Sequence, residues 1–172
     1  MKAILYTSCT GSTARYARML GKAFGLPVYS AKEAAGALPG GAEVIYLGWL
    51  MAGGIKGYAS ASRKYAVQAV CAVGMGATGT RTEEVRAHNA VPQDVPLFTL
   101  QGAYDIKKLH GLYRLLMSMM GPMLIKSLQE KDCRTPDEED MLALLQNSGD
   151  RVCEENLQAI IDWFTARQES QD

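Results

Sequence analysis

Residues 4–13 read ILYTSCTGST, and this stretch decides the fold. Its first half is a short apolar run that predicts a buried strand over residues 2–7. A cluster of serine, threonine and glycine follows at once over residues 8–13. Residues 14–24 then predict a helix, because Ala17, Leu20 and Phe24 recur at helical spacing. The stretch therefore predicts a strand that turns directly into a helix through a glycine- and hydroxyl-rich loop.

The same alternation of strand and helix continues along the chain. One helix is expected to end near residue 65, and another is expected to span residues 82–89. No helix is predicted over residues 30–42, which are rich in alanine and glycine. Alternating strands and helices predict a parallel sheet with helices on both faces, and near-continuous apolar strands fit burial on both sides. Further strands are expected at residues 26–29, 43–50, 66–73 and 95–100.

The pattern changes after the fifth strand. Residues 106–119 predict a helix with a wide apolar stripe, and Gly121-Pro122 is expected to break it before it resumes at residue 123. Thr135-Pro136-Asp137-Glu138 has the form of a capping box that begins another helix. We expect one domain over residues 1–172, with a helical insertion at residues 104–149 and a closing helix at residues 150–168.

Composition excludes several classes of protein. The chain of 172 residues carries 18 Lys+Arg and 18 Asp+Glu, and zero net charge argues against a bulk-electrostatic nucleic-acid binder. No apolar run approaches the length of a membrane span, and the apolar start is too short for a signal peptide. The four cysteines show neither CxxC nor zinc-ligand spacing, so we expect a reduced, cytoplasmic protein without a metal site.

The loop at residues 8–13 is suited to an anion. A helix N-terminus offers unpaired backbone N–H groups and a partial positive charge, and Gly11 lets the backbone approach closely. Four hydroxyl side chains in six positions favour a phosphate monoester over an ordinary N-cap, the alternative reading. No lysine follows the glycine, which excludes a Walker-type loop. Arg15 lies six residues after Cys9, one more than a phosphatase-like Cys-x5-Arg loop allows.

This loop resembles the phosphate loop of the flavodoxins, whose pattern is Ser/Thr-x-Thr-Gly-x-Thr; Ser8, Thr10, Gly11 and Thr13 match it. The resemblance implies an α/β, flavodoxin-like three-layer sandwich with a five-stranded parallel sheet of order 2-1-3-4-5, and noncovalently bound FMN. Segments Gly102-Ala103-Tyr104-Asp105, Lys108-Leu109 and Arg114-Leu115-Leu116-Met117 resemble the branch that includes the flavodoxin-type protoporphyrinogen oxidases, which carries a helical insertion after strand five. The resemblance covers most of residues 1–125.

The resemblance also implies which residues hold the cofactor. The loop at residues 8–13 would bind the phosphate. A second loop, residues 49–54, would lie against the isoalloxazine ring, and a third, residues 74–79, would give N–H groups to the N1/O2 edge of the ring. Trp49 is the candidate for stacking, with a plain core role as the alternative. The third loop matches GxGxxG, but it follows the fourth strand instead of the first, which argues against a dinucleotide site. The candidates are Ser8, Cys9, Thr10, Gly11, Ser12 and Thr13; Trp49, Leu50, Met51, Ala52, Gly53 and Gly54; and Gly74, Met75, Gly76 and Ala77.

The insertion is unusual in its methionines. Met117, Met119, Met120 and Met123 lie within seven residues, with basic residues around them. Such a segment, residues 106–126, could meet a membrane surface, a quinone or a porphyrin carboxylate, or it could cover the sheet or form a homodimer interface. His88 and His110 have no partner at metal-ligand or triad spacing and are expected to be surface or structural residues.

These features predict an FMN-binding protein that transfers electrons or catalyses an FMN-dependent oxidoreduction, with no catalytic acid/base pair of its own. A quinone-linked, protoporphyrinogen oxidase-like enzyme and a flavodoxin-fold binding protein that has lost FMN are the alternatives. A response-regulator domain is excluded, because residues 1–31 contain no acidic side chain. The charge is divided unevenly: residues 1–132 hold 15 Lys+Arg and 8 Asp+Glu, whereas residues 133–172 hold 3 and 10. A basic body suits an FMN phosphate and an anionic substrate or lipid surface.

Overall fold

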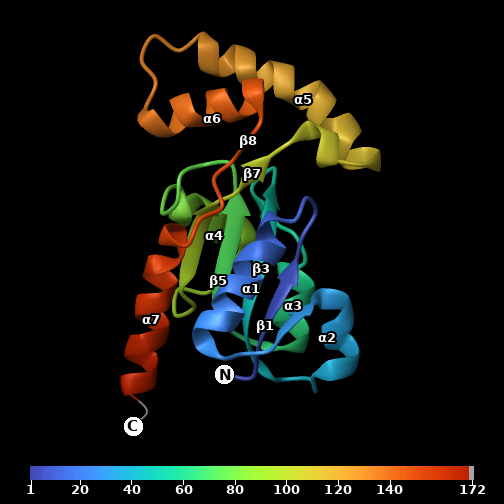
Figure 1. Ribbon diagram of the computed structural model, residues 1–172, viewed down its shortest axis with the longest axis vertical. Coiled ribbons are helices and arrows are strands. Elements are labelled where there is room, and N and C mark those ends of the chain that lie inside the picture. The colour runs from blue at the N-terminus through green and yellow to red at the C-terminus, as the bar shows by residue number, and fades with distance from the viewer. Residues whose placement is uncertain (171–172) are drawn as a thin grey trace.

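A computed structural model describes residues 1–170 and contains a central parallel sheet (Figure 1). Its five parallel strands lie in the order β2-β1-β3-β5-β6, which confirms the expected parallel sheet. Ile4 of β1 pairs with Ile45 of β3, so the most buried strands lie side by side at the centre. The strands are β1 (Ala3–Thr7), β2 (Val28–Ser30), β3 (Glu43–Met51), β5 (Ala66–Gly74) and β6 (Leu97–Gln101).

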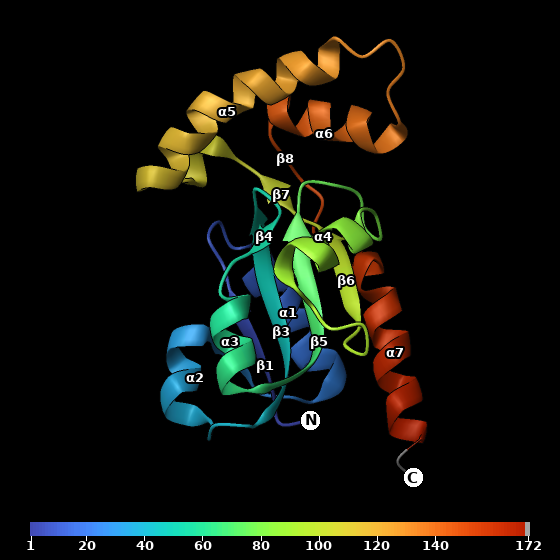
Figure 2. The same ribbon diagram turned by 180° about the vertical axis from the view of Figure 1, so that it is seen from behind.

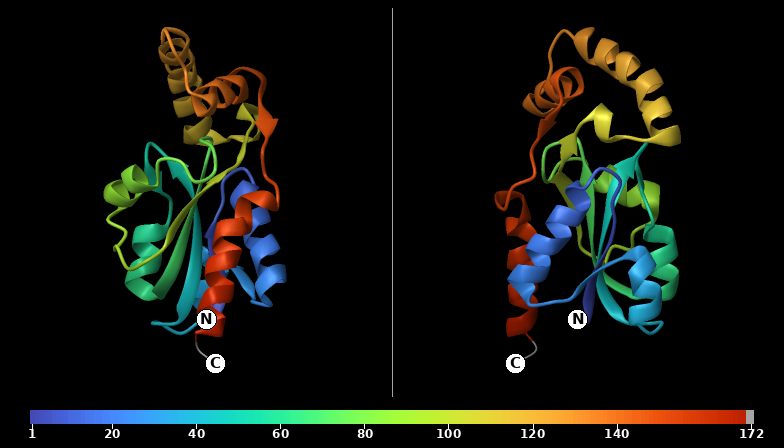
Figure 3. Two further views of the ribbon diagram at one scale, coloured as in Figure 1. Left: turned by 90° about the vertical axis from the view of Figure 1, so that its left-hand side faces the viewer. Right: turned by 45° about the vertical axis from the view of Figure 1, so that its right-hand side comes forward.

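Helices cover both faces of the sheet. On one face α1 (Ser12–Phe24) and α7 (Gln158–Glu169) pack against side chains such as Ile45. On the other face α2 (Ala31–Ala37), α3 (Tyr58–Lys64) and α4 (Thr82–Asn89) pack against side chains such as Tyr46. Figures 2 and 3 show the three layers from behind and from the side. Successive strand residues point to opposite faces, so one apolar run supplies both cores.

Two small elements of the sheet domain, α2 and β4 (Gly54–Ile55), were not predicted from the sequence. Helix α2 begins at a capping box in which the Ser30 hydroxyl accepts the Glu33 N–H and the Glu33 carboxylate accepts the Ser30 N–H. Strand β4 (Gly54–Ile55) pairs antiparallel with the end of β3. Ala52 and Gly53 between them both have positive φ, which is the backbone of a tight two-residue hairpin.

The helical insertion stands at the carboxyl end of the sheet (Figure 1). Its helices, α5 (Gly111–Gln129) and α6 (Pro136–Asn147), form a third apolar cluster with Tyr104. The chain enters and leaves through a short antiparallel ladder, β7 (Ala103–Tyr104) with β8 (Gly149–Asp150). A 3-10 turn, Ile106–Lys108, precedes α5. The insertion is thus a two-helix module on a two-stranded stem.

Two sequence predictions about this region were wrong. Gly121-Pro122 does not break the helix, since α5 runs continuously from Gly111 to Gln129. Gly121 is buried there, with the Tyr104 hydroxyl of β7 4.0 Å from the position of an added Cβ. The apolar cluster that α5 forms with Tyr104 and α6 offsets the cost of the proline. The closing helix begins at Gln158 instead of residue 150, because Asp150 pairs in β8 and a 3-10 turn spans Glu155–Leu157. Within residues 1–170, no helix is both long and apolar enough to cross a membrane.

Candidate functional site

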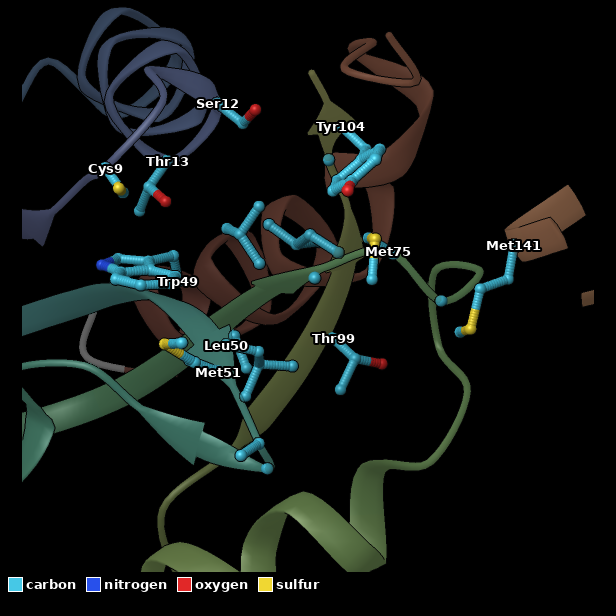
Figure 4. Close-up of a pocket in the computed structure, with 18 of the residues that line it drawn as sticks. Cys9, Ser12, Thr13, Trp49, Leu50, Met51, Met75, Thr99, Tyr104 and Met141 are labelled. Atoms are coloured by element: carbon cyan, nitrogen blue, oxygen red, sulfur yellow. The ribbon is translucent and has the colours of Figure 1, made fainter. Parts of the chain in front are cut away.

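A pocket of about 550 Å³ lies at the carboxyl ends of the central strands, and side chains of α5 line one side of it. This is the edge at which parallel α/β sheets bind ligands. The loops after β1, β3 and β5 converge on it, as do the inner faces of α5 and α6. Figure 4 shows Cys9, Ser12 and Thr13 on one side, with Trp49, Leu50 and Met51 below them. Three segments far apart in the sequence therefore share one cavity.

Most of the predicted site residues line this pocket, and three do not. The lining includes residues 9–10, 12–13, 49–53 and 74–77, but not Ser8, Gly11 or Gly54. Ser8 and Gly11 shape the loop instead, because the Gly11 N–H donates to the Ser8 hydroxyl at 3.2 Å and Gly11 has φ +104°. Gly54 pairs with Met51 in the small β4 ladder.

The first turn of α1 presents hydroxyl groups and free backbone donors to the pocket. Thr13 is only 1% exposed, and its hydroxyl has no hydrogen-bond partner within residues 1–170. The Ser12 hydroxyl accepts the Ala103 N–H at 3.1 Å, which leaves its own proton free to donate. The first turn contains no acidic side chain. No acidic side chain of the first turn itself opposes an anion at this positive helix end, although Asp105 of the insertion stem also lines the pocket.

Cys9 lies in the same loop but is not an activated thiol. Partial burial raises the pKa of the Cys9 thiol, so it stays protonated at neutral pH. A neutral thiol adds no negative charge to this loop. This agrees with the sequence argument against a phosphatase-like cysteine.

Trp49 lines the pocket and also contacts the insertion. Its ring meets that of Tyr113, on α5, edge to face at a centroid distance of 5.0 Å. The Lys56 ammonium lies over the indole at 6.0 Å from the ring centroid. Because these neighbours occupy part of its surface, Trp49 is both a wall of the pocket and a packing contact for α5.

The hairpin between β3 and β4 is held in place by α4. The Asn89 side chain donates to the Gly53 carbonyl at 2.8 Å and accepts the Ile55 N–H at 2.6 Å. The His88 imidazole packs against Gly53, and a Cβ there would come within 3.3 Å of the ring. His88 is exposed and packs on Gly53, which agrees with the surface or structural role expected from the sequence, and it also lines the pocket. The hairpin is thus fixed by two neighbouring residues of one helix.

The glycine-rich loop after β5 is tied to the insertion. The Ala77 N–H donates to the Asp137 carboxylate of α6. Gln101 bridges from the Met75 carbonyl, at 3.2 Å, to the Asp140 carboxylate, at 2.6 Å. One backbone donor that the sequence assigned to a ring edge is therefore already used by α6.

Asp140 is the ionic centre of this connection. Its carboxylate accepts from the Arg151 guanidinium at 2.8 Å, and this hydrogen bond is the main reason that the pKa of Asp140 lies below its ordinary value. The Asn156 side chain ties the Arg151 carbonyl to the Tyr16 hydroxyl of α1, at 2.9 and 2.7 Å. The stem of the insertion is thus joined to the sheet domain by a polar network.

The residues of α5 and α6 that line the pocket were not identified from the sequence. Met117 and Met120 of the methionine-rich stretch face the pocket, whereas Met119 and Met123 point to solvent. The signal was present in the methionine clustering, but helical spacing alone does not tell which face is covered. The added lining residues include His88, Thr99, Tyr104, Leu109, Tyr113, Met117, Met120, Leu124 and Met141.

Comparison with models of known protein families finds no match for this chain, and comparison with curated proteins finds none either.

Proposed function

We propose that this chain is a flavodoxin-like protein that binds FMN noncovalently in the pocket and uses it for electron transfer or oxidoreduction. The observation that carries the proposal is the convergence on one cavity of an anion-suited helix start and an aromatic, methionine-rich slot. FMN has the same two parts, a terminal phosphate and a flat ring system.

The residues present fit the phosphate group. Thr13 offers a nearly buried hydroxyl without a protein partner among the described residues, and the Ser12 hydroxyl keeps a free proton. The N–H groups of the first turn of α1 point out of the helix end without intrahelical acceptors. Gly11, at φ +104°, allows the sharp bend by which the chain passes from β1 into α1. A dianion is balanced there by donors and the helix dipole instead of by lysine.

The residues present also fit the ring. Trp49, Met51 and Met75 supply polarizable, apolar walls. Tyr113 and Met117 of α5 close the slot from the other side. Such walls exclude water and strengthen the remaining polar contacts, which come from backbone groups of the hairpin and the glycine-rich loop.

When bound, FMN would supply the redox chemistry through its N5 atom, by hydride or stepwise electron transfer. The chain's own residues bind and orient it. Asn89 holds the Gly53 peptide at the edge of the pocket, and the His88 ring packs against that peptide. No acid/base pair acts in addition. Whether the chain is an electron carrier or an enzyme depends on the partner, for which a quinone or a porphyrin is the candidate.

The experiment that tests the proposal compares FMN with riboflavin, which lacks the phosphate. Flavin fluorescence is followed while the purified chain is titrated with each compound. We expect FMN to bind more tightly than riboflavin, because only FMN reaches the α1 N-terminus. Thr13→Val keeps the size of the side chain and removes the hydroxyl, so it should lower FMN affinity roughly tenfold, the worth of a hydrogen bond to a charged group.

The control is Thr165→Val, at an exposed position of α7, which should leave both affinities unchanged. Riboflavin affinity should hardly respond to Thr13→Val. Equal affinities for FMN and riboflavin, or a Thr13→Val effect of the same size on both, would contradict the assignment of the phosphate to this loop.

A further inference from the structure

Helix α5 carries an apolar face that nothing in residues 1–170 covers. All the exposed large apolar side chains in the described part of the chain belong to this one helix. Four of them recur at helical spacing over three turns: Leu112 (66% exposed), Leu115 (57%), Met119 (65%) and Met123 (72%). Exposed apolar patches of this kind mark interaction surfaces. We call these four residues the outer face of α5.

The outer face is distinct from the side of α5 that closes the pocket. Tyr113, Met117 and Leu124 turn inward, where they pack in the cluster formed with α6. At 3.6 residues per turn, this inward side and the outer face lie on roughly opposite sides of the helix. Figure 1 shows α5 at the extreme end of the molecule, far from the C-terminus, so the outer face is unobstructed. A helix that is apolar on both sides normally lies within a core or in contact with lipid.

The charged side chains between Asp105 and Glu130 are all basic. Residues 106–129 contain four Lys and Arg residues and no Asp or Glu. Lys107, Lys108 and His110 immediately precede α5, and all three are exposed. Lys126 near the other end of the helix is also exposed, with Glu130 as a weak partner at 3.6 Å. Basic residues therefore lie at both ends of the apolar stripe, with Asp105 and Glu130 just beyond them and three basic residues, Lys107, Lys108 and His110, just before α5.

We propose that the outer face of α5 docks on an anionic lipid surface, with the helix lying in the plane of the headgroups. An apolar stripe bracketed by basic residues is the composition of an interfacial helix, in which apolar side chains enter the acyl boundary and ammonium groups meet anionic headgroups. At 19 residues, α5 is about 28 Å long, and it lies across the end of the molecule instead of passing through a bilayer.

A second copy of the chain fits this surface less well. A symmetric dimer through the outer face would bring the two sets of basic residues together, which is unfavourable. A head-to-tail contact needs an apolar patch elsewhere, and the described residues expose no other large apolar side chains. The charge and the isolation of the patch both favour lipid.

The docking surface and the pocket share one edge. Met120 lines the pocket and is also 38% exposed. Docking through the outer face therefore brings the α5 side of the pocket next to the lipid surface. The docking proposal itself rests on no bound cofactor, because none of the four outer-face residues lines the pocket.

The test is sedimentation of the full chain with vesicles. One set contains phosphatidylcholine alone and the other contains phosphatidylcholine with phosphatidylglycerol, each at low and high salt. We expect binding to the anionic vesicles that weakens with salt. Leu112→Gln with Met119→Gln should weaken this binding at least tenfold. Lys107→Gln with Lys108→Gln should weaken it by roughly fivefold for each lysine.

The control pair is Lys22→Gln with Lys32→Gln, which removes the same charge from exposed positions of α1 and α2 at the opposite end of the molecule. This pair should bind like the unmodified chain. Absence of binding to anionic vesicles at low salt, or unchanged binding of the Leu112/Met119 variant, would overturn the proposal. So would a dimer in solution, measured by light scattering, that the Leu112/Met119 variant dissociates. Flavin titration of the same variants is expected to be unchanged, so the docking and FMN proposals fail or succeed separately.

Discussion

Replacing Gly57 by alanine should destabilise the sheet edge beside the pocket. Gly57 has φ +84°, and an added Cβ would lie 2.1 Å from the Tyr46 hydroxyl oxygen and 2.6 Å from that of Thr7. Tyr46 is fully buried, which raises its pKa to about 12, and its neutral hydroxyl is hydrogen-bonded to the Lys56 carbonyl at 2.7 Å and to Thr7 at 2.8 Å. The added methyl group must push this network apart.

The magnitude follows from two costs. The left-handed backbone costs an alanine about 1–2 kcal/mol, and a buried hydroxyl or carbonyl left without its partner costs about 1–3 kcal/mol. We therefore expect Gly57→Ala to lower the free energy of unfolding by about 2–5 kcal/mol. Gly25→Ala is the matched control, because Gly25 has φ +64° with nothing within 4 Å of its Cβ position. Gly25→Ala should lower the free energy of unfolding only by the cost of the left-handed backbone.

Urea denaturation of both variants measures the difference. A double-mutant cycle with Tyr46→Phe sharpens it, because removal of the hydroxyl relieves the closest contact. Gly57→Ala should therefore cost less in a chain that already carries Tyr46→Phe than in the unmodified chain, by about 0.5–3 kcal/mol. An effect of Gly57→Ala on the free energy of unfolding that is no larger than that of Gly25→Ala would refute the steric argument. Strict additivity of the effects of Gly57→Ala and Tyr46→Phe on that free energy would also refute it.

Two further predictions concern the loops around the pocket. Asn89→Ala removes the hydrogen bond that holds the hairpin at Gly53, and it should weaken FMN binding roughly fivefold in a fluorescence titration. Asn147→Ala, at an exposed position of α6, should leave FMN binding unchanged. Equal effects of the two variants would contradict a role of Asn89 in holding the hairpin. Asp140→Asn removes the Arg151 ion pair. Because the folded pKa of Asp140 is lowered, its contribution to stability is present above the ordinary carboxyl pKa of about 3.9 and is lost as the pH falls through the folded value. The difference in melting temperature between Asp140→Asn and the unmodified chain should therefore shrink in acid, and a constant difference down to low pH would contradict this.

The fold was largely predictable where local and long-range signals agree. Strands such as β3 and β5 are near-continuous apolar runs, and burial on both faces demands such runs. The Thr135 capping box also marked the start of α6 correctly. The α2 helix was missed because alanine and glycine obscured the Ser30–Glu33 capping box, which was the available signal.

The errors lie where tertiary contacts override local preference. Gly121-Pro122 is a strong local breaker, but the buried Gly121 is a packing contact of α5. Strands β7 and β8 are only two residues long and pair across more than forty residues of chain, so no periodicity reveals them. Their pairing is decided by where the insertion must leave and rejoin the sheet domain.

The candidate site also has one part that the sequence predicts and one part that depends on tertiary packing. Its loop residues follow strand ends, so the parallel sheet brings Thr13, Trp49 and Met75 together once the strand order is known. The lid residues depend on how α5 is rotated over the pocket. Sequence spacing allows either Met117 or Met119 to face inward, and only packing against α6 selects Met117.

The central claim is that the pocket holds FMN, and the absorption spectrum of the purified chain tests it most directly. The protein is mixed with excess FMN, freed of unbound flavin by gel filtration, and scanned in the visible region. We predict a yellow protein that shows the bands of oxidised flavin at near one FMN per chain. A colourless protein that elutes without flavin after this treatment would contradict the account.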